Sequence, residues 1–207
     1  LPVRPHGDER DADLVGDAVA LVDQLHEAGF HDRAHGGVER GRVALGAGVD
    51  PALLARRAAV FPLLPCRQCA LCAVGAYAQC DRYGYLGSRS DGAFAEFVCV
   101  PVWNLLPIAE TLSYEEAAMA EPAAVALHAL RRAGLDAADT VAIFGAGPIG
   151  LLLAQWARNG GAARVLLLDI DGAKLNFAVR QGFHDVFNPA RGDADAWVRG
   201  GTGGGAD

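Results

Sequence analysis

Short apolar runs alternate with helical segments in the C-terminal part of the chain, and this alternation limits the possible folds more than any other feature. Residues 140–144 (TVAIF) and 164–170 (RVLLLDI) have the continuous apolar character of buried strands, and residues 148–161 and 172–182 have helical patterns that end at glycine. Residues 184–188 (HDVFN) are a candidate third strand. Continuous apolar strands between helices are typical of a parallel sheet with both faces covered. The sequence therefore predicts an α/β fold with a doubly wound parallel sheet.

The first of these strands leads into a glycine-rich turn, GAGPIG, at residues 145–150. Gly145 allows a tight turn, Gly147 lets a diphosphate approach the N–H groups at the positive end of the next helix, and Gly150 lets helix and strand pack closely. A bare GxGxxG string is a weak signal in a chain with 26 glycines, but its position between a strand and a helix strengthens it. A glycine-rich turn of some other α/β protein is the alternative.

An acidic residue ends the second strand at the spacing expected of a dinucleotide site. Asp169 lies 24 residues after Gly145, where a carboxylate accepts hydrogen bonds from the adenosine ribose and repels a 2′-phosphate. Lys174 either reaches the same ribose or is a solvated surface lysine. The sequence predicts a partial Rossmann domain that binds NAD rather than NADP through Gly145, Gly147, Pro148, Ile149, Gly150, Asp169 and Lys174.

Four of the five cysteines lie within fifteen residues, spaced C-x2-C-x2-C-x7-C at Cys66, Cys69, Cys72 and Cys80. An odd, clustered set of cysteines favours thiolate metal ligands over disulfides. Zinc takes four thiolates tetrahedrally, and such a site has no position left for water or substrate. We therefore expect a structural zinc ion that braces a loop; an iron–sulfur cluster and a nucleic-acid-binding zinc ribbon are the alternatives. The fifth cysteine, Cys99, is interpreted as a buried structural thiol.

Residues 1–60 use a restricted set of amino acids, with no Ser, Thr, Asn, Lys, Cys, Ile, Tyr or Trp. Valine alone supplies strand character there, so a β-rich interpretation has little local support. Apolar residues recur at helical spacing between residues 11 and 29, at Leu14, Ala18, Leu21, Val22 and Leu25. We expect a helix over this range.

The middle of the chain has ordinary globular composition. Residues 94–100 predict a strand that Pro101 closes. Ser113 and Glu116 fit a capping box at the start of a helix, Pro122 starts a second helical piece, and Gly134 ends it. We place a domain boundary in this helical stretch, between a first domain of residues 1–120 and a second of residues 121–207.

Several stretches together resemble the zinc-containing medium-chain dehydrogenases/reductases, most nearly their polyol dehydrogenase branch. The cysteine spacing, DGAFAEFV, EPAAVALHAL, TVAIFGAGPIGLLLAQWA and LLLDID occur in the family's order and at its distances, within residues 61–207. The resemblance implies a GroES-like, β-rich catalytic domain over residues 1–120, incomplete here, and a partial Rossmann domain over residues 121–207. It also implies hydride transfer from a polyol or polyol phosphate to NAD, with a catalytic zinc ion as Lewis acid.

The resemblance also assigns candidate catalytic and substrate residues. Glu121 matches one residue of the family's catalytic zinc environment, with a helix-end carboxylate as the alternative. Ser88 and Arg89 lie in a stretch that matches the family near the substrate cleft, and Arg89 is either a partner of a sugar phosphate or a solvated turn arginine. The family's C-G-x-D and G-H-E motifs are not found, and residues 1–60 do not match the family. A catalytically incompetent fragment with a structural zinc lobe is therefore the alternative to an active dehydrogenase.

Charge and composition bear on partners and location. The net charge of −7 and the single lysine argue against nucleic acid and anionic lipid as partners. No run approaches the roughly 18 to 20 apolar residues of a membrane span, and the charged start of the chain indicates the cytoplasm. The resemblance implies a homo-oligomer; TGGGAD at residues 202–207 precedes a further strand in the family, so the later strands and the dimer edge are expected to be absent.

Overall fold

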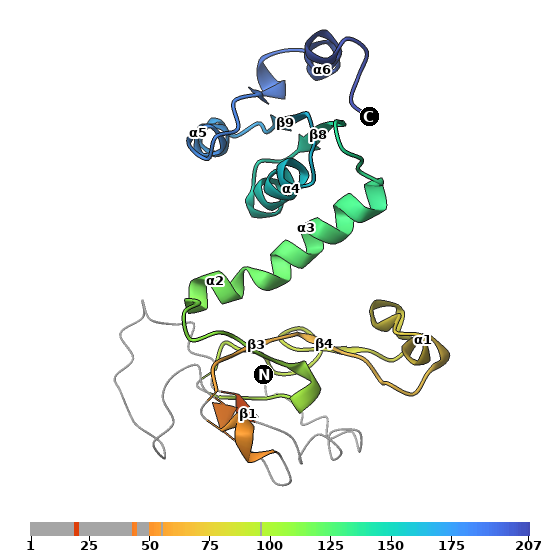
Figure 1. Cartoon of the computed structure of the whole chain (residues 1–207), viewed down its shortest axis with the longest axis vertical. Helices are drawn as coiled ribbons and strands as arrows, with labels where there is room; N and C mark the ends of the chain where they lie inside the picture. The colour runs from red at the N-terminus through yellow and green to blue at the C-terminus, as the bar shows by residue number, and fades with distance from the viewer. Residues whose placement is uncertain (1–18, 21–42, 45–49, 55, 96) are drawn as a thin grey trace, which may run out of the picture. The chain divides into compact units, whose positions relative to one another are not determined.

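The computed structural model describes residues 19–20, 43–44, 50–54, 56–95 and 97–207. It divides into two compact units, Leu1–Ala118 and Met119–Asp207, and Figure 1 labels the helices and several of the strands. Within the described ranges, no helix is both long enough and apolar enough to cross a membrane.

The first unit contains short strands that pair antiparallel (Figure 1). β1 (Val19–Ala20) lies between β2 (Val43–Ala44) and β6 (Val98–Cys99), β3 (Ala58–Val60) pairs with β7 (Leu105–Pro107), and β4 (Leu63–Leu64) pairs with β5 (Gly84–Tyr85). The helices are α1 (Ala70–Ala73) and α2 (Tyr114–Ala118), with short 3-10 turns at Pro51–Leu53, Tyr77–Gln79 and Val102–Asn104. This unit has the β-rich character that the sequence predicts for a GroES-like domain.

Three expectations for the first unit are wrong. Val19–Ala20 is a strand instead of part of a helix, because it pairs with a strand on each side and these long-range hydrogen bonds override the helical spacing; the other residues of 11–29 lie outside the described residues. Among the described residues of the strand predicted over 94–100, only Val98–Cys99 form a strand. Cys99 is exposed, since side chains alternate along a strand and those of Val98 and Val100 take the buried face.

Buried polar side chains fasten the loops of the first unit. The Nδ2 group of Asn104, which is 1% exposed, donates to the carbonyl oxygens of Phe61 at 2.6 Å and Leu63 at 2.7 Å. The Arg57 guanidinium donates to the carbonyl oxygens of residues 109–110. Both side chains bridge segments more than forty residues apart in sequence, and Asn104 holds the start of β4, which leads into the cysteine-rich segment.

The second unit is a three-stranded parallel sheet with helices around it (Figure 1). The strands are β8 (Thr140–Phe144), β9 (Arg164–Leu168) and β10 (Val186–Phe187), in the order β10-β9-β8. The helices are α3 (Ala120–Ala133), α4 (Pro148–Asn159), α5 (Gly172–Arg180) and α6 (Ala194–Thr202), with a 3-10 turn at Pro189–Arg191. The predicted parallel strands and the two helices between them are confirmed. Figure 1 shows α6 on the side of the sheet away from α4.

Apolar residues between the sheet and its helices form the core of the second unit. The strand residues Ile143 and Leu167 and the helix residues Ala154, Leu175 and Ala178 are buried together. The continuous apolar run of β9 is explained by this arrangement, because a central parallel strand has both faces covered. The core lies directly below the glycine-rich turn and holds its two flanking elements together.

The helix boundaries at the junction of the two units follow the predicted capping residues. The Ser113 N–H donates to Glu116 Oε2 at 2.8 Å, and the Glu116 N–H donates to Ser113 Oγ at 3.1 Å, which confirms the capping box of α2. Donation from the Ser113 backbone and side chain lowers the pKa of the Glu116 carboxyl. Gly134 ends α3 with a φ of +76°. The second helical piece begins at Ala120 and includes Pro122 in its first turn. Backbone N–H groups in the first turn have no partner within the helix, so a proline there costs no hydrogen bond.

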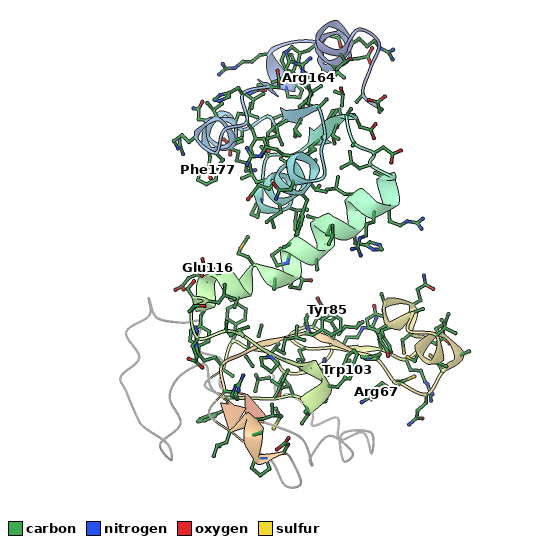
Figure 2. All side chains as sticks on the ribbon, viewed as in Figure 1. Arg67, Tyr85, Trp103, Glu116, Arg164 and Phe177 are labelled. Carbon is green, nitrogen blue, oxygen red and sulfur yellow. The ribbon has the colours of Figure 1, made fainter. Side chains whose placement is uncertain are left out.

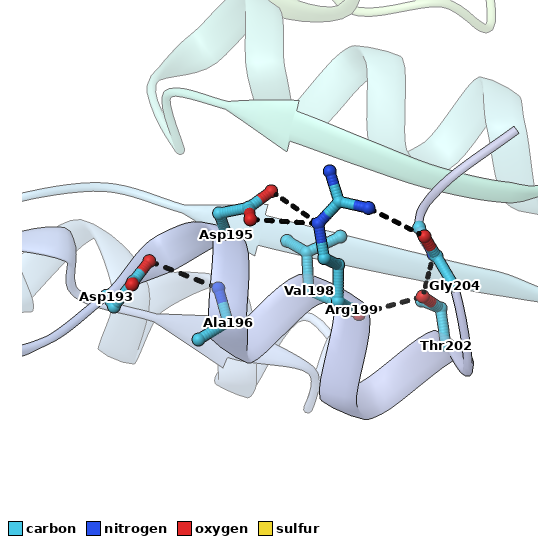
Figure 3. Close-up of polar contacts among 8 residues, drawn as sticks. Asp193, Asp195, Ala196, Val198, Arg199, Thr202 and Gly204 are labelled. Carbon is cyan, nitrogen blue, oxygen red and sulfur yellow. Dashed lines mark hydrogen bonds and ion pairs between the residues drawn. The ribbon is translucent and has the colours of Figure 1, made fainter.

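The C-terminal helix α6 is closed at both ends by side chains (Figure 3). Asp193 Oδ1 accepts a hydrogen bond from the Ala196 N–H at 3.1 Å at the start of the helix. Arg199 pairs with Asp195 one turn earlier at 2.8 Å and donates to the Gly204 carbonyl at 3.2 Å. These local contacts explain why α6 continues to Thr202 although the chain is rich in glycine after residue 199.

Candidate metal centre and nucleotide-binding turn

The four clustered cysteines converge on one lobe of the first unit. Cys66 follows β4, Cys69 is the N-cap of α1, Cys72 lies within α1, and Cys80 follows the 3-10 turn at Tyr77–Gln79. Their sulfur atoms all lie within 4.8 Å of one another, and none forms a disulfide. The structure therefore brings together all four residues that the sequence assigns to the structural metal.

Backbone N–H groups point at the sulfur atoms, as expected where thiolates are held. The Cys66 N–H donates to Cys80 Sγ at 3.3 Å. The pKa of Cys66 is lowered to about 6, first of all by the Gln68 N–H, and the pKa of Cys69 is lowered chiefly by the Cys72 N–H. Hydrogen bonds of this kind favour the charged form of a ligand.

Burial has the opposite effect on Cys72, whose pKa rises to about 12. The two cysteines therefore have opposite preferences, since N–H donors favour the thiolate of Cys66 and burial favours the thiol of Cys72. A divalent cation that prefers sulfur removes the conflict, because it stabilises all four residues as thiolates and displaces the proton. The donor set, its compactness and its N–H groups fit a tetrahedral zinc ion.

Aromatic residues fasten this lobe to the body of the first unit. The Trp103 ring packs edge-on against Phe61 at 5.7 Å and Tyr77 at 5.1 Å between ring centroids, and the Arg67 guanidinium lies 5.7 Å from its centroid. Figure 2 labels Trp103 and Arg67 in this region. Sequence analysis did not single out Trp103, since no local pattern marks a contact with residues 26 to 42 positions away. Its position makes its fluorescence a reporter of the lobe.

In the second unit, the glycine-rich turn joins the carboxyl end of β8 to the start of α4. Gly145 has a φ of +107°, and its N–H donates to the Leu168 carbonyl at 2.7 Å. A Cβ atom at Gly150 would lie 1.7 Å from the Gly145 carbonyl oxygen, whereas a Cβ atom at Gly147 would meet no protein atom within 4 Å. The helix thus packs tightly on the turn at Gly150, and the turn leaves open space beside Gly147.

Asp169, directly after β9, is tied to this turn. Its Oδ2 atom accepts a hydrogen bond from the Ala146 N–H at 2.8 Å, and its Oδ1 atom accepts one from the Asp171 N–H at 2.8 Å. Lys174 Nζ lies 3.9 Å from Oδ2, and its own side chain is half exposed. The N–H groups of Asp171 and Ala146 lower the pKa of the Asp169 carboxyl, and Lys174 adds to the effect. The contact with Ala146 was not expected from the sequence.

Pro148 and Ile149 form the first turn of α4 after the Gly147 N-cap. The aligned N–H groups there give the helix start a partial positive charge. Together with Gly145, Gly150 and Asp169, they make an anion-accepting turn beside an ionised carboxylate, which is an arrangement suited to a diphosphate linked to a ribose.

The remaining candidate residues, Glu121, Ser88 and Arg89, are not among the residues that form these two sites. Glu121 is exposed in the first turn of α3, and among the described residues it belongs to no cluster that could hold a metal. Ser88 and Arg89 are exposed in the loop after β5. The Arg89 guanidinium is engaged by Tyr83, because it donates to the Tyr83 carbonyl at 3.0 Å and to the hydroxyl at 2.9 Å.

Comparison with known proteins relates the chain to one family. The alcohol dehydrogenase GroES-like domain model matches residues 36–110. In sequence and fold the chain is similar to the medium-chain alcohol and polyol dehydrogenases. The match begins at residue 36 and therefore includes residues 36–60, which corrects the expectation that the whole of residues 1–60 is unrelated to the family. The predicted fold class, a GroES-like domain with a Rossmann-type α/β domain, is confirmed.

Curated relatives in this medium-chain family act on polyols or sugars, as their names state. Galactitol 1-phosphate 5-dehydrogenase of Escherichia coli K12 is 41% identical over 145 residues, which are 70% of this chain and 42% of the relative. D-xylulose reductase A of Aspergillus niger is 34% identical over 137 residues, which are 66% of this chain and 38% of the relative. The chain thus spans less than half the length of these relatives.

Solved structures of the family agree with the fold. Galactitol-1-phosphate dehydrogenase of Escherichia coli has a TM-score of 0.67 at 34% identity and covers 87% of this chain and 54% of its own. An Escherichia coli CFT073 alcohol dehydrogenase complexed with NADH has a TM-score of 0.67 at 32% identity, over 72% of this chain and 44% of its own. A Sinorhizobium meliloti 1021 protein bound to NADP has a TM-score of 0.70 at 34% identity, over 74% of this chain and 45% of its own.

Proposed function

We propose that this protein is an NAD-dependent dehydrogenase that oxidises a secondary hydroxyl group of a polyol or polyol phosphate, of the galactitol 1-phosphate or sorbitol kind. The observation that carries the proposal is the glycine turn after β8, whose Ala146 N–H is held by the Asp169 carboxylate. Polyol dehydrogenases among the relatives support the substrate class. The second unit, taken as residues 121–207, is the nucleotide-binding domain, and residues 1–120 are the catalytic domain.

The turn binds the cofactor through backbone groups and one carboxylate. The diphosphate occupies the space beside Gly147. There it accepts hydrogen bonds from the backbone N–H groups that follow Pro148 in the first turn of α4, and the positive end of this helix attracts it. Asp169 accepts hydrogen bonds from the adenosine ribose, and its negative charge disfavours a 2′-phosphate, so that NAD is preferred to NADP. Lys174 lies beside the same ribose. When bound, the nicotinamide supplies the hydride acceptor.

The four-cysteine centre holds a structural zinc ion in this proposal. Cys66, Cys69, Cys72 and Cys80 would supply all four ligands, so the ion would brace the lobe and leave no site for substrate. Reduced thiols of this kind fit a cytoplasmic location. A separate catalytic zinc ion would supply Lewis-acid chemistry at the alcohol oxygen, and Glu121 is the one residue of this chain that we assign to its environment.

Substrate recognition is assigned to the loop after β5. Ser88 offers a hydroxyl group, and Arg89 offers a guanidinium suited to a phosphate dianion. Arg89 must exchange its contacts with Tyr83 for substrate oxygens. Replacement of Arg89 by glutamine should therefore raise the KM for a polyol phosphate more than that for the unphosphorylated polyol.

The experiment that tests the proposal combines binding and turnover. NADH fluorescence should rise on titration with the protein, and NADPH should bind more weakly. NAD reduction at 340 nm should then be followed with a panel of polyols and polyol phosphates. The absence of any NADH binding by folded protein would overturn the nucleotide assignment, and binding without turnover of any polyol would overturn the activity.

A second candidate is a nucleotide- and zinc-binding protein without dehydrogenase activity. It is favoured by one observation: within the described residues, the four cysteines are the only group placed to hold a metal, and Glu121 is not among them. Useful catalytic zinc sites have three protein ligands. Metal analysis separates the candidates, since one tightly held zinc ion per chain fits the second candidate and an additional ion that a mild chelator removes fits the dehydrogenase.

A further inference from the structure

The four-cysteine centre carries more negative charge than its metal can balance. Four thiolates around a divalent cation leave a net charge of about −2. Cys72 and Cys80 are 5% and 3% exposed, so water cannot solvate that charge from their side of the centre. Charge in such a place must be offset by nearby donors, because burial without compensation is unfavourable.

Backbone N–H groups supply part of this compensation, but they carry only partial charges. They come from residues of the lobe itself, including Gln68 to Cys66 and Arg67 to Cys72. The Arg67 guanidinium points elsewhere, over the ring of Trp103. A full positive charge beside the centre can come only from another cationic side chain.

Arg82 is placed to supply it. Its Nη2 atom lies 3.9 Å from Cys66 Sγ, and across the part of the chain that the structure describes it is the only cationic side chain with a hydrogen bond to one of the four sulfurs. At this distance the interaction is mainly electrostatic. Cys66 is one of the two partly exposed cysteines of the four, so Arg82 contacts a sulfur on the side of the centre that solvent reaches.

We propose that Arg82 is a positioning residue of the metal centre: its guanidinium offsets the charge of the thiolates at Cys66 and so slows the loss of the metal ion. This inference rests on the proposal that the four cysteines hold a divalent cation. Metal-site partners outside the ligand set change affinity by about 10- to 100-fold when they are removed. Because Arg82 is exposed and screened by solvent, the effect belongs at the lower end of that range.

The test follows metal release from the full chain. Zinc transfer to 1,10-phenanthroline, a neutral chelator that Arg82 neither attracts nor repels, is measured for the wild type, Arg82→Gln, Arg82→Lys and Arg56→Gln. Release from Arg82→Gln should be about tenfold faster than from the wild type, and Arg82→Lys should lie between them. Arg56→Gln removes an equal charge from an exposed residue of the same unit, and it should release zinc at the wild-type rate.

Two further measurements separate this role from a general loss of structure. Added salt should speed release from the wild type and have less effect on Arg82→Gln, because salt screens the guanidinium. In the Co²⁺-loaded protein, the sulfur-to-metal absorption band of Arg82→Gln should move to longer wavelength, since Cys66 becomes more electron-rich, while the far-ultraviolet circular dichroism stays unchanged.

Equal release rates for Arg82→Gln and the wild type, with unchanged cobalt spectra, would overturn the assignment of Arg82 and leave the metal centre standing. A wild-type chain that is folded and binds neither zinc nor cobalt would overturn the metal centre and the role of Arg82 together.

Discussion

Two glycine-to-alanine replacements separate the packing role of the glycine-rich turn from its binding role. At Gly150, a Cβ atom would lie 1.7 Å from the Gly145 carbonyl oxygen and 2.8 Å from its carbon. Both neighbours are backbone atoms, so relief to about 3.0 Å requires α4 and the turn to separate by about 1.3 Å, the difference between 3.0 and 1.7. Overpacking of this kind costs about 1–3 kcal/mol, and backbone partners place it at the upper end.

At Gly147, the same methyl group meets no protein atom within 4 Å, and a φ of −76° suits alanine. The unfolding temperature of Gly147→Ala should therefore equal or slightly exceed that of the wild type. Its affinity for NADH should fall by about tenfold, which corresponds to about 1.4 kcal/mol, because the methyl group fills the space that the diphosphate needs.

The assay measures thermal unfolding by circular dichroism and NADH binding by fluorescence for both variants. A loss of about 3 kcal/mol lowers the unfolding temperature of a unit this size by roughly 12 °C or more. Gly150→Ala with the wild-type unfolding temperature would refute the packing argument. Undiminished NADH binding by Gly147→Ala would refute the position of the diphosphate.

Three further predictions concern the first unit. Cys80→Ser should lower the zinc content measured by atomic emission well below one ion per chain and change the Trp103 fluorescence; full zinc content would contradict the four-thiolate site. Asn104→Ala should lower the free energy of unfolding of the unit, measured in urea, by about 2–4 kcal/mol, because two buried carbonyl groups lose their donor. Truncation of the exposed Leu106 should change this free energy by less than about 1 kcal/mol. Equal losses would show that the hydrogen bonds of Asn104 are unimportant. The pKa of the Glu116 carboxyl is lower in the folded chain than its ordinary value. The ionised carboxylate therefore stabilises the fold fully at a pH above the ordinary pKa, and this stabilisation is lost as the pH falls through the folded-state pKa. The unfolding temperatures of wild type and Glu116→Gln should therefore differ at pH 7 and converge once the pH is below the folded-state pKa; a difference that persists in strong acid would exclude the ionised capping box as its source.

Local sequence patterns predicted the second unit well. The apolar run at residues 140–144 became β8 with the same bounds, and the helices after it begin and end within two residues of their predicted ranges. These elements are determined by spacing and capping over a few neighbouring residues. The first unit was predicted less well, because its strands are two or three residues long and form only through pairing with distant segments.

The residues of the candidate sites show the same difference between features set by local sequence and features set by the fold. The spacing of the four cysteines and the GAGPIG string mark the metal and nucleotide residues, since each motif needs its residue types at short, fixed separations. The hydrogen bond from Ala146 to Asp169 and the approach of Arg82 to Cys66 join residues 23 and 16 positions apart. Only the folded chain brings such pairs together, because the turn of the backbone and the packing beneath it, rather than any local pattern, set the distance between them.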